Sequence, residues 1–147
     1  MSQIHVSFDT DLLQLDRIYD FLSNSYWSPN LQREVFDRGI ENSLCIGAYD
    51  RETGAQVGFA RVVTDYGRFA YLCDVFVFEE YRGQGIGQAM CAALIDHESL
   101  RTVGHWVLAT KDAHSVYSKL GFVQADKRYM MLKRSSDRWQ QPDPNAS

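Results

Sequence analysis

The segment of this chain best suited to chemistry is a glycine-rich hexapeptide, Arg82–Gly87, with the sequence Arg-Gly-Gln-Gly-Ile-Gly. It follows the apolar run Phe69–Phe78 and precedes residues whose apolar members recur at helical spacing. A glycine-rich turn that opens a helix presents unpaired backbone N–H groups and the positive end of the helix dipole. The sequence therefore predicts a pyrophosphate-binding site at the start of a helix near Ile86.

Two common phosphate-binding loops do not fit this segment. No Gly-Lys-Ser or Gly-Lys-Thr ending follows the glycines, which excludes a Walker A loop. A dinucleotide fingerprint lies at the first strand of a βαβ unit, whereas more than half of this chain precedes Arg82.

A single charge, Asp74, interrupts the apolar run ahead of the glycines. Burying a carboxylate in such a run is costly without a compensating partner. Two interpretations are open. Asp74 accepts a proton from an amine or binds its ammonium form, or it makes a structural hydrogen bond or ion pair. Arg61 is a candidate cation that would neutralise either Asp74 or Asp65.

The elements that position these groups follow from the apolar periodicity. The first helix is predicted over 11–24. Ser28 and Pro29 predict the N-cap and first residue of a second helix ending near 40. Another helix begins near Ile86, with Ala89, Met90, Ala93 and Leu94 on its apolar face. Asp112 is expected to cap a last helix, which ends near 120. Strands are predicted at 4–8, 44–49, 56–64, 69–78, 105–110 and 129–133, with 122–123 as the candidate start of a seventh.

The order β-α-α-β-β-β-α-β-α-β predicts a mixed α/β fold, with a twisted sheet of six to seven strands and helices on both faces. The 147 residues favour one domain over 1–134, followed by a polar, flexible tail over 135–147. The net charge of −4 disfavours a nucleic-acid or membrane partner. The three cysteines match no metal or redox spacing, so reduced thiols, no bound metal and a cytoplasmic location are expected.

Two segments together resemble the GNAT superfamily of coenzyme A-dependent N-acetyltransferases. The strand followed by Arg-x-x-Gly-x-Gly and a helix is similar to the family's motif A. The second segment, Thr110–Phe122, places Ala113 four residues before Tyr117 and closes with Leu-Gly-Phe. The resemblance covers roughly residues 3 to 134. It implies that the fourth and fifth strands separate to admit the pantetheine arm of acetyl-CoA.

The resemblance also implies a set of cofactor-binding residues. Backbone groups of Val75, Phe76 and Val77 would line the pantetheine, and an N–H near Val77 would stabilise the oxyanion. The family usually has asparagine where this chain has Thr110, whose hydroxyl can replace only one of the amide's hydrogen bonds. The full expected set is Val75, Phe76, Val77, Arg82, Gly83, Gln84, Gly85, Ile86, Gly87, Thr110, Ala113 and Tyr117.

The resemblance assigns Tyr117 as the acid that protonates the departing thiolate. Transfer from a phenol of pKa ~10 to a thiolate of pKa ~8.5 is uphill by about 2 kcal/mol. A hydrogen bond without full proton transfer is therefore one alternative for Tyr117, and simple packing on its helix is another.

Acceptor contacts in this fold come from the first two helices, their connection and the turn before the fourth strand. Besides Asp74, the candidates are Tyr26, Trp27, Asp65, Tyr66 and His114. The Tyr26–Trp27 pair could stack on a ligand or hold a cation. It could equally cover the edge of the core, and His114 could be a surface residue.

The leading hypothesis is transfer of acetyl from acetyl-CoA to the primary amine of a small molecule, by direct attack in a ternary complex. One alternative acceptor is a protein N-terminus or lysine. A different class of function, a non-catalytic acyl-CoA sensor, fits the phosphate loop equally well. A homodimer is compatible with the resemblance.

Overall fold

The computed structural model describes residues 3–125 and 127–134, which fall into two compact units. We call them the sheet unit, drawn from Met1–Leu13 and Asn42–Gln124, and the helix unit, drawn from Gln14–Glu41 and Ala125–Ser147. The single domain over 1–134 stays a prediction, and the predicted flexible tail over 135–147 lies outside the described residues. In the described part of the chain, no helix is long and apolar enough to span a membrane.

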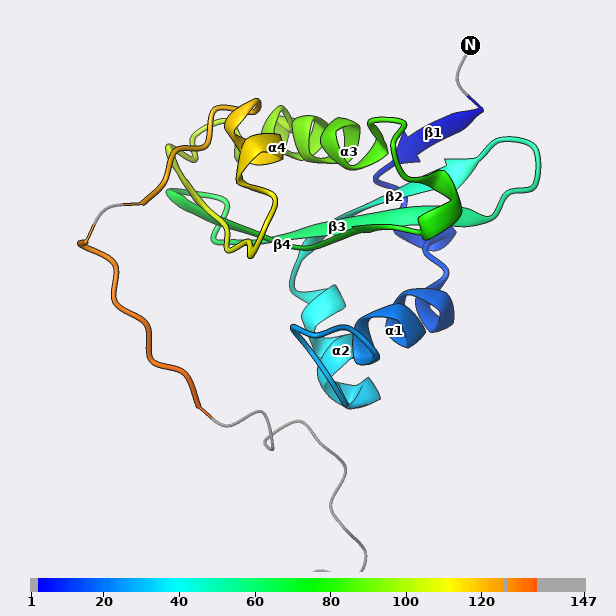
Figure 1. Ribbon diagram of the computed structural model, residues 1–147, viewed down its shortest axis with the longest axis horizontal. Coiled ribbons are helices and arrows are strands. Elements are labelled where there is room, and N and C mark those ends of the chain that lie inside the picture. The colour runs from blue at the N-terminus through cyan, green and yellow to red at the C-terminus, as the bar shows by residue number, and fades with distance from the viewer. Residues whose placement is uncertain (1–2, 126, 135–147) are drawn as a thin grey trace, which may run out of the picture. The chain divides into compact units, whose positions relative to one another are not determined.

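The sheet unit is built on five strands that lie in chain order (Figure 1). The first four strands pair antiparallel, and the fifth pairs parallel to the fourth. Since parallel neighbours need a crossover, a helix separates the last two strands in the chain. The predicted mixed α/β class is confirmed. The strands are β1 (Ile4–Ser7), β2 (Leu44–Asp50), β3 (Gln56–Thr64), β4 (Phe69–Val77) and β5 (His105–Val107).

Helix α3 (Ile86–Ile95) packs on one face of this sheet. Its buried side chains include Ile86, Met90 and Leu94, as predicted, but Ala89 is exposed and Cys91 is buried instead. The helix lies very close to β3 at Gly58, where an added Cβ would stand 3.1 Å from the Met90 methyl group. This contact fixes α3, and with it the glycine loop, on the sheet.

Helix α4 (His114–Ser118) belongs to the same core, because Tyr117 and the following Leu120 and Phe122 pack against it. The predicted cap by Asp112 is wrong. The Thr110 hydroxyl instead accepts the Ala113 N–H at 3.1 Å, and α4 begins at the next residue, His114. Three short 3₁₀ turns complete the unit, at Thr10–Leu12, Glu79–Tyr81 and Glu98–Leu100.

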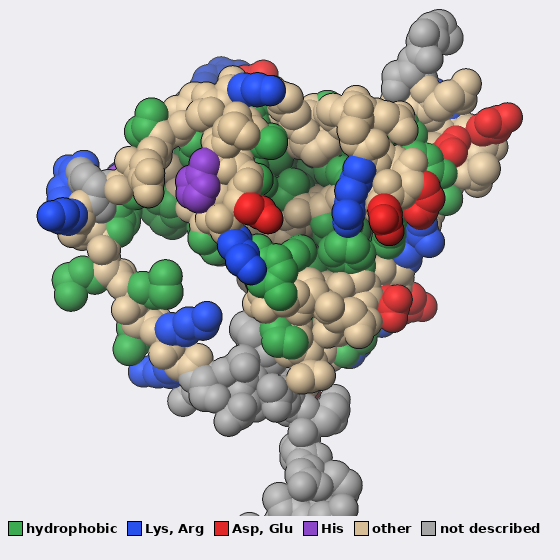
Figure 2. Space-filling view, in the orientation of Figure 1, with side chains coloured by type: hydrophobic (Ala, Val, Ile, Leu, Met, Phe, Trp, Pro, Cys, Tyr) green, Lys and Arg blue, Asp and Glu red, His purple; other side chains and the backbone are tan. Residues whose placement is uncertain are grey.

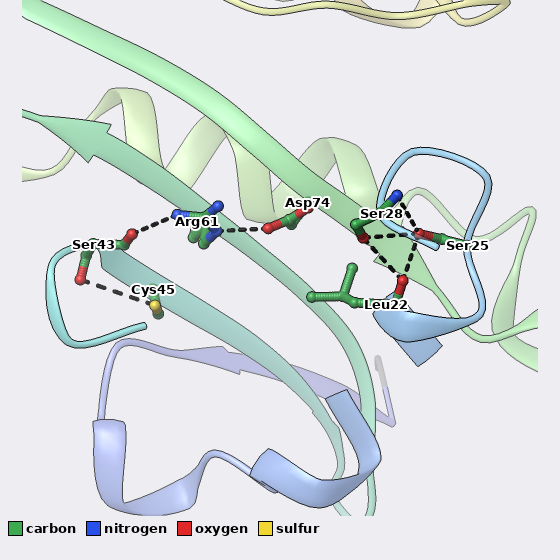
Figure 3. A network of polar contacts seen from close by, with 7 residues as sticks. All are labelled: Leu22, Ser25, Ser28, Ser43, Cys45, Arg61 and Asp74. Atoms are coloured by element: carbon green, nitrogen blue, oxygen red, sulfur yellow. Dashed lines mark hydrogen bonds and ion pairs between the residues drawn. The ribbon is translucent and has the colours of Figure 1, made fainter. Parts of the chain in front are cut away.

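The helix unit contains α1 (Leu15–Ser23) and α2 (Arg33–Glu41), which begin later than predicted. Ser28 does not cap α2. Its hydroxyl donates to the Leu22 carbonyl at 2.9 Å and lies 3.1 Å from the Ser25 hydroxyl, at the C-terminal end of α1 (Figure 3). Both serines are buried, and the Leu22 carbonyl also accepts the Ser25 hydroxyl at 2.7 Å, so both hydroxyls bind the carbonyl end of α1.

The predicted strands at 129–133 and 122–123 are absent from the sheet, which has five strands in the described part of the chain rather than six or seven. A strand needs a neighbour for its backbone hydrogen bonds. The side chains of Met130, Met131 and Leu132 are instead largely exposed, and Val123 is 88% exposed.

Candidate functional site

The glycine loop enters α3 through left-handed backbone. Gly83 and Gly85 have φ of 82° and 77°, and no atom lies within 4 Å of the Cβ that either residue would carry. Gly85 is the N-cap of α3, and no side chain caps the helix there. The first N–H groups of α3 therefore have no side-chain cap, and no side chain of Gly83 or Gly85 stands beside them, which suits a phosphate group.

The loop is fixed to the sheet by Arg82, whose Nε donates to the Val77 carbonyl oxygen at 2.8 Å. Val77 is the last residue of β4, so the end of the strand and the start of α3 are tied together within ten residues of chain. The rest of the exposed guanidinium adds positive charge beside the helix N-terminus.

Among the described residues, no strand pairs with the β5-side edge of β4 next to the loop. Pairing with β5 covers Phe69–Tyr71 alone, whereas β4 continues to Val77. In the described residues no other strand takes the place of β5 beyond Tyr71. This agrees with the predicted separation of the two strands beside Val75, Phe76 and Val77.

A β-bulge lies at Asp74, in the middle of β4. Phe59 pairs with Phe76 and Arg61 with Cys73, so Ala60 alone opposes both Asp74 and Val75. Asp74 has a φ of 55°, in the left-handed region where such bulges commonly use glycine. Because a bulge changes the direction of the side chain at its first residue, Asp74 can reach the cation that pairs with its neighbour.

That cation is Arg61 on β3, whose Nε donates to Asp74 Oδ2 at 2.6 Å (Figure 3). Arg61 Nη1 also donates to the Ser43 hydroxyl at 2.8 Å. The two charged side chains are only 22% and 13% exposed. Desolvation works to lower the pKa of Arg61, but the Asp74 carboxylate together with the neighbouring Cys73 and Cys45 outweighs it and the pKa is raised.

The ion pair confirms Arg61 as the partner of Asp74, not of Asp65. A structural role for Asp74 is thereby supported by geometry, while its role in proton transfer stays a prediction. The contacts of Ser43 and Cys45 beside the pair were not anticipated from the sequence. In the sequence, the ion pair is signalled by two single charges, Arg61 and Asp74, each of which interrupts an apolar strand.

The cysteines of the sheet unit are strongly disfavoured as nucleophiles. Burial raises the pKa of Cys45 to about 11 and that of Cys73 to about 12, although the Arg61 charge opposes this. Burial likewise raises the pKa of Cys91 to about 12. Thiolate is the reactive form, so these thiols are inert near neutral pH.

This inertness is measurable by thiol labelling. At pH 8 a thiol of pKa about 12 is thiolate to about one part in ten thousand, against roughly a quarter for an ordinary cysteine. We expect a disulfide reagent to label the folded protein at least about 100-fold more slowly than the protein unfolded in guanidinium. Equal rates in both states would contradict the raised pKa values.

Tyr117 is partly buried and makes an edge-to-face contact with Phe122, their ring centroids 6.2 Å apart. It lies on α4 one turn from the exposed His114. Gly121 has a φ of 100° and ends this segment as predicted. Thr110 is engaged with the Ala113 N–H, so its hydroxyl organises the turn before Tyr117.

The other acceptor candidates are distributed over both units. The Asp65 carboxylate accepts the N–H groups of Gly67, Arg68 and Phe69, which lowers its pKa and ties it into the turn before β4. Tyr66 in that turn is 47% exposed. In the helix unit, Tyr26 and Trp27 form an edge-to-face pair with centroids 5.1 Å apart. Acceptor binding by these residues stays a prediction.

A five-strand sheet with a bulged fourth strand, followed by a glycine-rich turn into a helix, defines a class of mixed α/β protein in which the turn and the helix start form the candidate site. The family model described as an acetyltransferase (GNAT) domain matches residues 41–124. The chain therefore belongs to the GNAT acetyltransferase family.

Individual relatives agree with this assignment. A GNAT-family protein from Xanthomonas campestris pv. campestris is 36% identical in a crystal structure, with a TM-score of 0.87 over 96% of this chain and 99% of that chain. A Gibberella zeae protein named as an acetyltransferase is 30% identical over 135 residues, covering 78% of this chain and 75% of the relative. A Clostridium acetobutylicum protein whose structure contains acetyl-CoA shares the fold at 19% identity, with a TM-score of 0.66 over 90% of this chain and 96% of that chain.

Proposed function

We propose that this chain transfers an acetyl group from acetyl-CoA to the primary amine of a small molecule, by direct attack in a ternary complex. The observation that carries the proposal is the uncapped N-terminus of α3, entered through Gly83 and Gly85 without side chains and tied to the end of β4. The acetyl-CoA in the Clostridium acetobutylicum structure supports the choice of donor.

The residues present suit coenzyme A. Backbone N–H groups from Gly83 to Gly87, with the positive end of the α3 dipole, would hold the diphosphate. The part of β4 beyond its pairing with β5, at Val75, Phe76 and Val77, would offer backbone groups to the amide-rich pantetheine arm. When bound, acetyl-CoA supplies a thioester that is activated toward attack by an amine.

The reaction requires two proton transfers, one from the acceptor amine and one to the leaving thiolate. A free alkylamine is neutral to only about 0.04% at pH 7, so its proton must be taken up. Asp74, ion-paired with Arg61, would attract the ammonium form and pass its proton to water. An N–H near Val77 would stabilise charge on the acetyl oxygen. Tyr117 would donate to the leaving sulfur.

The acceptor amine would be held by the Asp74 carboxylate. Stacking or cation–π contact by Tyr26 and Trp27 suits an amine cation, and Tyr66, Asp65 and His114 are further candidates. Charges of both signs are interspersed on the face in Figure 2, which suits a small acceptor better than a nucleic acid. We further propose that the protein acts in the cytoplasm, an expectation supported by three cysteines that form no disulfide.

The phenol of Tyr117 tests catalysis separately from binding. Tyr117→Phe removes the proposed donor to the leaving thiolate but keeps the ring against Phe122. We expect kcat to fall at least about 10-fold with little change in the affinity for acetyl-CoA. The measurement is thiol release from acetyl-CoA across a panel of primary amines, with affinity from calorimetry.

Tyr81→Phe is a matched control. Tyr81 is also partly buried against the core, and its hydroxyl donates to Asp50 Oδ2 at 3.2 Å. Tyr81→Phe removes this hydrogen bond and keeps the ring. Its kcat should stay within about 2-fold of the parent. An unchanged kcat in Tyr117→Phe would remove the acid assignment. Binding of CoA without thiol release for any amine or peptide in the parent would favour the sensor function.

A further inference from the structure

Arg61 has hydrogen-bonding capacity that its ion pair does not use. Among the described residues, its hydrogen bonds run from Nε to Asp74 and from Nη1 to the Ser43 hydroxyl (Figure 3). A guanidinium has five N–H donors, so three of them, including both on Nη2, remain for a ligand. The side chain is 22% exposed, which leaves it accessible to a small molecule. The planar guanidinium is best matched by a carboxylate, which accepts two parallel hydrogen bonds.

A second hydrogen-bonding group, the Tyr71 hydroxyl, lies near this arginine. Arg61 pairs with Cys73 across the sheet, and Val63 pairs with Tyr71. Because side chains two residues apart on a strand share a face, Arg61 and Tyr71 lie on the same face of the sheet. Burial and the neighbouring Cys73 and Asp74 raise the pKa of Tyr71, while the Arg61 charge opposes the rise. The phenol therefore lies within electrostatic range of both members of the ion pair.

The Tyr71 hydroxyl is available to a ligand as a donor. Tyr71 is 36% exposed, and its hydroxyl makes no hydrogen bond within the described part of the chain. Its raised pKa keeps the phenol protonated near neutral pH, so it donates to an anion and does not repel it. Arg61 and Tyr71 thus present donors on one face of the sheet, and we call these two residues the anion subsite.

The ion pair beside the anion subsite favours an acceptor that carries two opposite charges. Arg61 already compensates the charge of Asp74, so the ammonium group of a simple amine would compete with Arg61 for the same carboxylate. An amine that also carries a carboxylate avoids this competition. Its carboxylate can lie on Arg61 while its ammonium group lies on Asp74, and each charge then has a neighbour of opposite sign.

We propose, on the basis of the acetyl transfer proposed above, that the anion subsite binds a carboxylate of the acceptor. The acceptor is then an amino acid, or a similar amine with a carboxylate close to it, and not a polyamine. Asp74 holds the ammonium group of the same molecule, and Arg61 and Tyr71 determine specificity.

Paired acceptors test the carboxylate directly. Each common L-amino acid is compared with its carboxamide, which keeps the amine and the side chain but removes the negative charge. The carboxamide lowers the basicity of the amine, so intrinsic reactivity favours the carboxamide, and a preference for the acid must come from binding. We expect at least one amino acid to have a kcat/KM at least about 10-fold above that of its carboxamide, mainly through a lower KM.

Two variants test the residues of the anion subsite. Tyr71→Phe removes one hydroxyl and leaves the ion pair intact, and Arg61→Lys keeps a cation beside Asp74 but loses the planar set of donors. Each should lower the acid-to-carboxamide ratio of kcat/KM at least about 5-fold. This ratio is measured within one variant, so a loss of folded protein cancels. Tyr81→Phe, which removes a tyrosine hydroxyl elsewhere in the sheet unit, should keep the parent's ratio.

Calorimetry separates the anion subsite from catalysis. The same pairs are titrated into the protein saturated with free coenzyme A, which carries no acetyl group to transfer. Tighter binding of an acid than of its carboxamide, weakened in Tyr71→Phe, supports the subsite even where no amine is acetylated, an outcome that would remove the proposed function alone. Equal use and equal binding of acid and carboxamide in every pair overturn the subsite and leave acetyl transfer in place. An unchanged ratio in Tyr71→Phe or in Arg61→Lys also overturns it.

Discussion

Gly85→Val is expected to lower the affinity for coenzyme A at least about 100-fold, which corresponds to about 2.8 kcal/mol. Gly85 has a φ of 77° and precedes the first residue of α3. A β-branched side chain there is strained by about 1–2 kcal/mol. Its atoms would also occupy the open space in front of the α3 N–H groups, where the diphosphate is proposed to bind. Isothermal calorimetry with free coenzyme A measures the loss directly.

The chain offers a closely matched control at Gly54, which has the same φ of 77° and equally open space around its Cβ position. Gly54 lies in the turn between β2 and β3, away from the loop in sequence and on no part of the proposed site. Gly54→Val should therefore lose a similar amount of stability but keep its affinity for coenzyme A within about 2-fold.

The comparison separates strain from binding. If both variants lose affinity equally, the loss reflects general destabilisation and gives no support to the loop as the phosphate site. If neither loses affinity, the diphosphate does not bind at the N-terminus of α3 and the proposed function fails with it.

Asp74→Ala is expected to lower the free energy of unfolding by about 3 kcal/mol. The substitution leaves the Arg61 guanidinium, 22% exposed, without its 2.6 Å carboxylate partner. Breaking a buried ion pair on one side costs about 3–5 kcal/mol, and partial exposure places this pair at the lower end. Alanine also adopts the φ of 55° less readily than aspartate. Denaturant unfolding followed by circular dichroism gives the value.

Two variants show where the loss arises. Asp74→Asn keeps an acceptor for Arg61 and a residue that tolerates left-handed backbone, so it should lose less than half as much. Glu98→Ala breaks the exposed pair with Arg101, whose side chains are 87% and 76% exposed, and should change stability by less than about 0.5 kcal/mol. A loss below 1 kcal/mol in Asp74→Ala would show that the ion pair contributes little, and would leave Asp74 to a role in acceptor chemistry.

Local sequence determined the parts of the fold that depend on neighbouring residues. The nearly continuous apolar runs of β2 and β3 placed those strands within a residue of their observed ends. The glycines at 83 and 85 required left-handed backbone that few other residues adopt, so the loop and the start of α3 were predictable. The glycine loop after β4 and the Thr110–Phe122 segment were together enough to indicate the GNAT family.

Contacts between distant residues were decided by the tertiary structure. The ion pair of Asp74 with Arg61 depends on a bulge in β4, and a one-residue insertion in a strand leaves no mark in an apolar sequence pattern. Thr110 rather than Asp112 holds the start of α4, and Ser28 serves the end of α1 rather than the start of α2. These polar groups take whichever backbone partner the folded chain brings within hydrogen-bond distance. The segment at 129–133 has a strand-like sequence, but it joins no sheet in the described residues, and a strand forms only where a second backbone completes its hydrogen bonds.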